Sequence, residues 1–244
     1  MPTTINHRER RIGERLFVEL RLSSDNGVNP LSSGNVREIR ETMRRLSPLG
    51  AAHGLLISAE GKSFSAGADV KEFRTFGEPE FRQYMSDILA MYAEMTEFPK
   101  PILSIVQADA LGGGAALAFY SDFVIACETA RFGLPEVHRG MAGGGYLMPR
   151  LIGKHRAAEM VLLGRNFTAQ EMLDWGLVNV VCPQADLEPQ TDKLCQELAR
   201  LTDSAFAVAK TSLAGGLTVT MREGMERHIA AQTEAFRRAR AAAG

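Results

Sequence analysis

Three consecutive glycines, Gly112 to Gly114, constrain the fold of this chain more than any other feature. They follow an apolar, β-rich run at 101–106 and lead directly into an apolar helical segment at 115–120. Glycine lets a backbone approach a ligand closely, and the N-terminus of a helix presents N–H groups that have no helical partner. The segment therefore fits either a tight turn made for packing alone or a turn that stabilises negative charge on a bound group.

A second segment has the same construction. An apolar strand at 54–59 is followed by a turn and then by the small residues Ser65, Ala66, Gly67 and Ala68. Two strand ends that both finish in small residues can place two backbone N–H donors around one oxygen atom. Taken together, the two segments favour charge stabilisation over packing alone.

The composition limits the class of protein. The 244 residues are enough for one large domain, and the balance of 28 basic and 29 acidic side chains gives no general attraction to nucleic acid or membrane. Three widely spaced cysteines form neither a disulfide framework nor a zinc pattern, and no metal site is expected. No apolar run reaches the roughly eighteen residues that span a bilayer, and no secretory signal is evident. We therefore expect a cytoplasmic protein.

Strands alternate with helices along the chain, which predicts an α/β protein. Strands are expected at 15–22, 55–58, 101–106 and 123–126, and helices at 36–46, 78–97 and 115–120. A further helix is expected after Gly145, through Leu151 and Ala157 to Leu163, with more helices in the tail. Thr168 and Glu171 have the spacing of a capping box. In the 78–97 segment, helical spacing predicts one core-facing stripe, formed by Phe81, Met85, Ile88, Leu89 and Tyr92.

Four blocks of the sequence resemble the enoyl-CoA hydratase/isomerase (crotonase) superfamily. They are FSAGADV at 64–70, GGG at 112–114, ARFGLPE at 130–136 and GRNFTAQEMLDWGLVNVV at 164–181. The resemblance implies the crotonase (ClpP-like) α/β fold, a spiral of repeated ββα units, at 1–186. It also implies a C-terminal helical oligomerisation region at 187–244, which would build a homotrimer or homohexamer.

The same resemblance assigns roles to particular residues. The backbone N–H groups of Ala68 and Gly113 correspond to the donors that hold a thioester oxygen, and Ala66, Asp69 and Val70 correspond to the turn that recognises adenine. The implied substrate is an acyl-CoA thioester of fatty acid metabolism, and coenzyme A enters only as part of that substrate, without a further cofactor.

One position departs from the hydratases of the superfamily. Hydratases carry a glutamate two residues after the glycine triplet and a second one twenty positions later. Here the first is Ala116, and the second is Glu136. Hydration divides its proton transfers between two carboxylates, whereas moving a double bond from the β,γ to the α,β position needs a single base. Glu136 is therefore expected to act as the single acid/base of an isomerase, with a pKa raised by the apolar side chains of Phe132, Leu134 and Ala116.

Other reactions stay open at this stage. Glu136 alone could handle water in a hydratase or lyase, and a malonyl-type thioester decarboxylase would need the two N–H donors more than a base. His138 is a second candidate acid/base. From a different class comes an acyl-CoA-binding protein that keeps the fold but turns nothing over.

Overall fold

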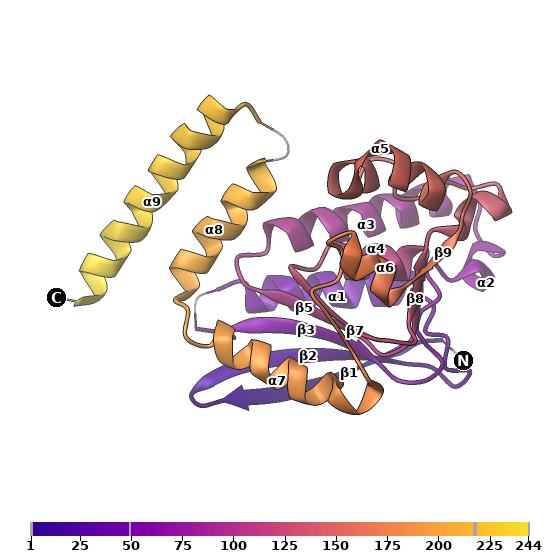
Figure 1. The fold of residues 1–244 in the computed structure, drawn as a ribbon, viewed down its shortest axis with the longest axis horizontal. Coiled ribbons are helices and arrows are strands. Elements are labelled where there is room, and N and C mark those ends of the chain that lie inside the picture. The colour runs from indigo at the N-terminus through magenta and orange to yellow at the C-terminus, as the bar shows by residue number, and fades with distance from the viewer. Residues whose placement is uncertain (1, 49, 217–218, 244) are drawn as a thin grey trace.

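The computed structural model describes residues 2–48, 50–216 and 219–243, and it has an α/β fold with a larger and a smaller sheet (Figure 1). The larger sheet has the order β1–β2–β3–β5–β7–β10, with bounds Thr4–Ile12, Arg15–Ser23, Gly54–Ala59, Ile102–Val106, Phe123–Cys127 and Val180–Cys182. The smaller sheet has the order β4–β6–β8–β9, with bounds Ser63–Ser65, Asp109–Leu111, Arg131–Gly133 and Asn166–Thr168.

A repeating ββα unit contributes strands to both sheets. In each repeat the first strand joins the larger sheet and the second strand joins the smaller one, and helical structure follows. The repeats are β3–β4 with helices α2 (Val70–Phe73) and α3 (Glu78–Glu97), β5–β6 with α4 (Gly113–Phe119), and β7–β8 with the short 3₁₀ helix η1 (Pro135–Arg139) and α5 (Met148–Val161). This is the spiral that the sequence resemblance implies.

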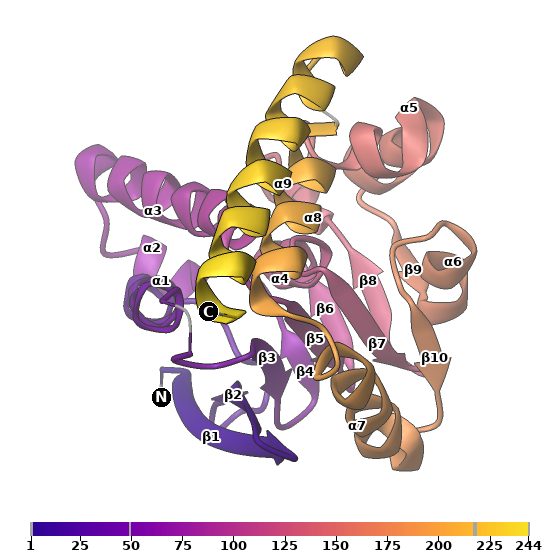
Figure 2. The same ribbon diagram turned by 90° about the vertical axis from the view of Figure 1, so that its left-hand side faces the viewer.

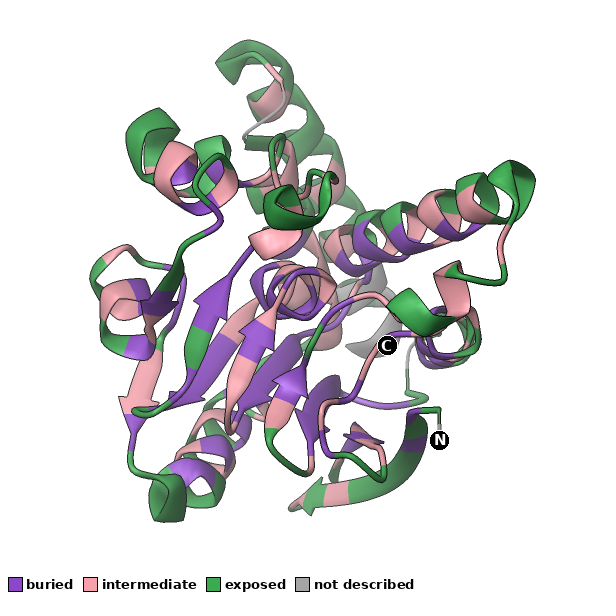
Figure 3. Cartoon of the chain, turned by 90° about the vertical axis from the view of Figure 1, so that its right-hand side faces the viewer, coloured by how far each residue is buried: buried purple, intermediate pink, exposed green. Residues whose placement is uncertain are grey.

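The middle and the edge of the larger sheet differ in polarity. Every residue of β3 and β5 is buried, because parallel strands that are covered on both faces carry continuous apolar runs (Figure 3). β1 is instead an edge strand rich in exposed charges, and it pairs antiparallel with β2 along its whole length. An edge strand with charged side chains resists pairing with other chains. The sequence analysis did not predict β1, because its charges hide the strand period.

Helix α3 has the predicted bounds, and the predicted core residues Ile88 and Tyr92 are buried, but its buried stripe is rotated from the predicted one. Its buried residues are Tyr84, Ile88, Met91, Tyr92 and Met95. Leu89, which was predicted to face the core, is 57% exposed. The helix packs against α1 (Ser33–Leu46). The hydroxyls of Tyr84 and Tyr92 donate to backbone carbonyls beneath the helix, so the face that carries the two tyrosines points inward.

The remaining helices lie toward the C-terminal end of the chain. They are α6 (Ala169–Asp174), the 3₁₀ helix η2 (Gln184–Asp186), α7 (Leu187–Leu198), α8 (Asp203–Gly216) and α9 (Met221–Ala243). The capping box predicted for α6 is present, since Thr168 Oγ1 accepts from the Glu171 N–H at 3.2 Å and Glu171 Oε2 accepts from the Thr168 N–H at 2.7 Å. α7 packs on β1 and β7, while α8 and α9 run antiparallel to each other (Figure 2).

A buried ion pair fixes α8 to the sheet. Lys210 Nζ of α8 lies 2.7 Å from Asp122 Oδ2, and it also donates to the Lys100 carbonyl. Asp122 in turn accepts from the Ile102 N–H at the start of β5. Within the described residues no helix combines the length and the apolar character needed to cross a membrane.

Candidate active site

Three segments singled out in the sequence meet at one edge of the smaller sheet. Strands β4, β6 and β8 are parallel neighbours, with Ser65 opposite Ala110 and Leu111 opposite Gly133. The carboxyl ends of parallel neighbours lie at the same edge, so the stretches 66–69, 112–114 and 134–139 that follow these strands are brought side by side. The topology, rather than proximity in sequence, assembles the site.

The backbone around Ala68 is held so that its N–H points away from its neighbouring strand segment. Leu31 forms an isolated parallel bridge with Ala68, in which the Leu31 N–H donates to the Gly67 carbonyl at 2.8 Å and the Asp69 N–H donates to the Leu31 carbonyl at 3.1 Å. Groups alternate in direction along an extended chain, so the Ala68 N–H faces the opposite side. Among the described residues it has no hydrogen-bond partner.

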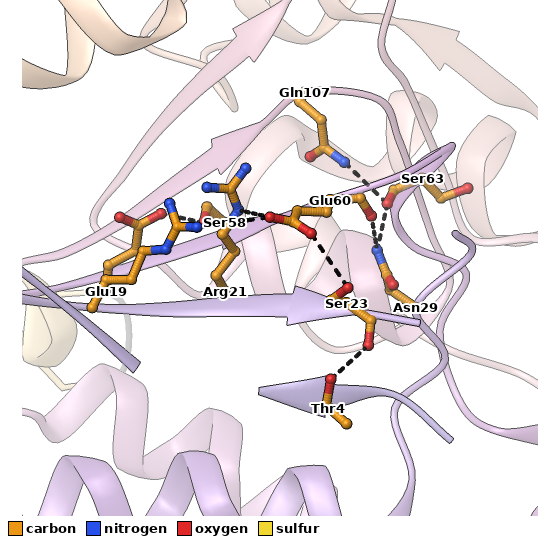
Figure 4. Close-up of polar contacts among 10 residues, drawn as sticks. Thr4, Glu19, Arg21, Ser23, Asn29, Ser58, Glu60, Ser63 and Gln107 are labelled. Atoms are coloured by element: carbon orange, nitrogen blue, oxygen red, sulfur yellow. Dashed lines mark hydrogen bonds and ion pairs between the residues drawn. The ribbon is translucent and has the colours of Figure 1, made fainter. Parts of the chain in front are cut away.

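The loop that carries Leu31 is hydrogen-bonded to the β3–β4 turn. Figure 4 shows the Asn29 side-chain amide between two carbonyls, donating to Glu60 at 2.7 Å and to Ser63 at 2.9 Å. Asn29 is fully buried with φ of 50°, a left-handed conformation that asparagine tolerates better than most residues. Its own carbonyl accepts from the Ser65 hydroxyl at 2.8 Å. The loop that pairs with the Ala68 segment is therefore held in place by the hydrogen bonds of Asn29.

The glycine triplet makes a turn that only glycine permits. Gly112 has φ of 56° and ψ of −127°, and its N–H donates to the Gly133 carbonyl at 2.8 Å. Gly113 is the first residue of α4, where an N–H has no partner within the helix. A Cβ placed on Gly113 would lie 3.6 Å from the Ala68 nitrogen. The two predicted donors are thus adjacent in space, although 45 positions separate them in the sequence.

Glu136 brings a carboxylate to the same place. It lies in η1, and a Cβ on Gly112 would be 3.0 Å from its Oε1. Oε2 is buried and has no hydrogen-bond partner among the described residues. Burial raises the pKa of Glu136, and the opposing effects of its own backbone N–H and of Arg139 are smaller. This is the direction expected from the sequence.

Comparison with known proteins identifies the family. The sequence profile described as "Enoyl-CoA hydratase/isomerase" matches residues 15–244. The chain belongs to the enoyl-CoA hydratase/isomerase family. Both the resemblance seen in the sequence and the crotonase fold that it implied are thereby confirmed.

Relatives and solved structures agree with this assignment. The chain is 35% identical to a probable mitochondrial enoyl-CoA hydratase of Dictyostelium discoideum, over 84% of this chain and 74% of that one. It is 37% identical to an enoyl-CoA isomerase/hydratase of Mycosarcoma maydis, over 70% and 64%. A crystal structure of enoyl-CoA hydratase from Bacillus anthracis superposes with a TM-score of 0.87 at 29% identity, covering 93% of this chain and 90% of that one.

The residues matched to the family's adenine site lie in the turn before α2. Ala66 and Val70 are exposed and Asp69 is half-buried. The Ala66 N–H already donates to the Val28 carbonyl at 2.8 Å, and Asp69 Oδ1 caps α2 by accepting from the Lys71 N–H at 2.9 Å. The Ala66 N–H and one oxygen of the Asp69 carboxylate are therefore already engaged within the protein.

His138, the second candidate acid/base, packs away from the glycine turn, and Tyr146 is turned to solvent. The His138 ring packs against Gly164, where a Cβ would lie 2.7 Å from its Nε2. Tyr146 is 89% exposed. Within the described part of the chain no group of three or more His, Cys, Asp or Glu side chains could hold a metal ion. The carboxylate of Glu136 lies beside the glycine turn, as its distance to a Cβ on Gly112 shows.

The sequence placed Tyr92 in the core-facing stripe without a partner for its hydroxyl, and it did not single out Tyr84. The Tyr92 hydroxyl donates to the Gly113 carbonyl at 2.8 Å, and the Tyr84 hydroxyl donates to the Leu31 carbonyl at 2.9 Å. The available signal was the residue type, because a tyrosine on a buried helix face usually has a partner for its hydroxyl.

Proposed function

We propose that this chain shifts the double bond of a β,γ-enoyl-CoA thioester to the α,β position, with Glu136 as the single acid/base. The observation that carries the proposal is the carboxylate of Glu136 beside the turn that presents the Gly113 and Ala68 N–H groups. One turn into α4, where a second carboxylate would serve hydration, the chain has the methyl group of Ala116.

The proposed reaction needs no oxidant, reductant or further cofactor. Glu136 takes a proton from the α-carbon, and the electrons of that C–H bond move into the thioester as an enolate. The N–H groups of Ala68 and Gly113 donate to the enolate oxygen, each contributing roughly 3–4 kcal/mol. The enolate then takes the same proton from Glu136 at the γ-carbon, which leaves the double bond at the α,β position.

Hydration of an α,β-enoyl-CoA is the second candidate, because most of the named relatives are hydratases. In this reaction Glu136 would have to position and deprotonate the water and also deliver a proton to the α-carbon. A single carboxylate performs both transfers less readily than a pair. The geometry therefore favours isomerisation.

The deciding experiment offers the protein both β,γ-enoyl-CoA and α,β-enoyl-CoA in deuterated water and follows the products by mass spectrometry and NMR. Conversion of the first thioester to the second without 3-hydroxyacyl-CoA supports isomerisation. Formation of 3-hydroxyacyl-CoA from either thioester supports hydration. Loss of CO₂ from a malonyl-type thioester would contradict both candidates and favour a decarboxylase. Binding without turnover of any thioester would favour an acyl-CoA-binding protein.

The variant Ala116→Glu separates the two leading candidates further. It adds the carboxylate that isomerisation does not need, so we expect 3-hydroxyacyl-CoA to form at least about tenfold faster than in the wild type. Ala116→Gln is the matched control, since it has nearly the same shape and no charge. Equal hydration rates in the two variants would show that the missing carboxylate is not what limits hydration.

The pKa of Glu136 gives a pH dependence. The carboxylate must be ionised to take the α-proton, so kcat/KM for isomerisation should fall about tenfold per pH unit below the pKa of Glu136 in the free enzyme. Because burial raises that pKa, the midpoint should lie above the value of about 4.3 for an unperturbed glutamate. A profile that stays flat to pH 4 would contradict Glu136 as the base.

The assembly proposed for this chain is a homotrimer or homohexamer. Its support is a row of large apolar side chains left exposed on α8 and α9, namely Leu213, Met221, Met225, Ile229 and Phe236. Burying such a row against another copy removes apolar surface from water. Light scattering should give a mass of several 26.6 kDa chains, and a monomer at micromolar concentration would contradict the proposal.

A further inference from the structure

Helix α3 contacts both halves of the donor pair through two buried tyrosines. The Tyr84 hydroxyl donates to the Leu31 carbonyl at 2.9 Å, and the Tyr92 hydroxyl donates to the Gly113 carbonyl at 2.8 Å. Their side chains are almost fully covered, with 2% and 5% of the two residues exposed. Helix α3 is thus bonded directly to the Gly113 segment, and to the Ala68 segment only through Leu31, which forms a bridge with Ala68.

The Tyr84 bond acts on the Ala68 segment. The Leu31 carbonyl that receives the Tyr84 hydroxyl also accepts the Asp69 N–H at 3.1 Å, and that bond is one of the two that hold Ala68 in its bridge with Leu31. A carbonyl held from two sides has little freedom to tilt. The direction of the Ala68 N–H is therefore fixed through Leu31.

The Tyr92 bond acts on the glycine turn. Gly113 is the first residue of α4, and its carbonyl lies one peptide unit from the N–H that serves as donor. A Cβ on Gly113 would lie 3.3 Å from the Tyr92 hydroxyl and 3.5 Å from Ile88 Cδ1, so α3 lies directly over the first turn of α4. The position of the Gly113 N–H depends on this contact.

Aromatic packing holds the two tyrosine rings. Tyr84 meets the Phe73 ring edge to face at a centroid distance of 4.9 Å, and Tyr92 stacks on Tyr120 at 4.7 Å with 5° between the planes. Burial raises the pKa of both hydroxyls, so both remain neutral donors at physiological pH. Within the described residues the Tyr120 hydroxyl has no hydrogen-bond partner, although its ring is packed in the same way.

We propose that the hydroxyls of Tyr84 and Tyr92 are positioning groups, which set the separation and direction of the Ala68 and Gly113 N–H donors through the Leu31 and Gly113 carbonyls. The inference rests on the proposed function, because it assigns those two N–H groups to a thioester oxygen. The tyrosines act through the backbone and exchange no proton with the substrate. Misplacing a donor by a fraction of an ångström weakens its bond to a developing oxyanion more than it weakens substrate binding.

The test uses Tyr84→Phe and Tyr92→Phe, which keep the rings and remove the hydroxyls, and Tyr120→Phe as the matched control. We expect kcat for isomerisation to fall about tenfold in each of the first two variants, while KM and the midpoint of the pH profile stay unchanged. A conjugated arylacryloyl-CoA gives an independent reading, because its absorption band moves to longer wavelength when its carbonyl is polarised. The shift should shrink in Tyr84→Phe and Tyr92→Phe and persist in Tyr120→Phe.

Three results would overturn the proposal. If both variants keep kcat and the band shift within about twofold of wild type, the hydroxyls do not determine the positions of the Ala68 and Gly113 N–H groups. If either variant moves the pH profile, that hydroxyl takes part in proton transfer instead of positioning. If Tyr120→Phe loses as much as the other two, the loss does not depend on the hydrogen bonds to the Leu31 and Gly113 carbonyls. Should one variant fail to fold, the other decides the outcome by the same two measurements.

The failure of the proposed function would look different. In that case the wild-type protein would produce no band shift with the arylacryloyl-CoA and no isomerisation, so the comparison between tyrosine variants would have no starting signal. A band shift with the wild-type protein but no isomerisation would support the two N–H donors and contradict only the proposed reaction.

Discussion

Replacing Glu136 by glutamine should lower kcat for isomerisation by about 10³-fold while KM changes little. General acid–base catalysis by a positioned side chain contributes about 10² to 10⁴ in rate, and here one group would perform both the removal and the return of the proton. Glutamine has almost the same shape but cannot accept a proton at neutral pH. The thioester oxygen would still meet the N–H groups of Ala68 and Gly113, so binding should persist.

The stability of this variant provides its internal check. The pKa of Glu136 is higher in the folded chain than in the unfolded one, so the ionised carboxylate destabilises the fold above that pKa, and the cost vanishes as pH falls below the unfolded value. Glu136→Gln should therefore melt a few degrees higher than wild type at pH 7, and this advantage should shrink toward pH 4. Glu14→Gln, in the exposed β1–β2 turn, is the control for loss of a charge.

Two results would contradict the assignment. Turnover by Glu136→Gln within about tenfold of wild type would remove Glu136 from the mechanism. Loss of turnover together with a lower melting temperature would point to a structural role for the carboxylate. Isothermal titration with a non-reactive acyl-CoA would show whether the binding is kept.

Much of the site could be predicted from the sequence because its signals are local. Gly112 to Gly114 is needed where a backbone turns sharply, and the placement of Glu136 follows from the strand end at Gly133. The alternation of apolar strands and helices predicted the α/β class. The spacing of Thr168 and Glu171 predicted the residue at which α6 begins. Each of these depends on chemistry within a few residues.

What the sequence did not predict depends on contacts between distant segments. β1 carries consecutive charges, as an exposed edge strand can, and nothing local separates it from a charged loop. The buried face of α3 is rotated from the predicted one, since Leu89 is exposed and Tyr84 is buried, and the Tyr84 hydroxyl bonds the Leu31 carbonyl, which is 53 positions away. The adjacency of Ala68 and Gly113, which the resemblance implied, is produced by the pairing of β4 with β6.

The second large effect is expected for Gly114→Ala, which should lower the free energy of unfolding by about 2 kcal/mol and kcat by about 100-fold. A Cβ on Gly114 would collide with the Ser65 carbonyl and lie 2.6 Å from the Ser65 Cβ. Backbone cannot rotate aside as a side chain can, so β4 and α4 must separate. Alanine's better helix propensity, about 1 kcal/mol, offsets only part of this cost.

The activity should fall further than the stability alone would explain, because this contact joins the two donor segments. Ser65 Oγ donates to the Asn29 carbonyl and accepts from the Gly67 N–H, so moving Ser65 moves the segment that carries Ala68. Moving α4 displaces the Gly113 N–H at the same time, and an error near 1 Å costs about 10²-fold. Gly34→Ala, in the first turn of α1 with its nearest neighbour at 3.6 Å, is the control and should leave kcat unchanged. Denaturant unfolding and steady-state kinetics on both variants decide the matter, and wild-type kcat in Gly114→Ala would show that the donors do not depend on the contact between β4 and α4.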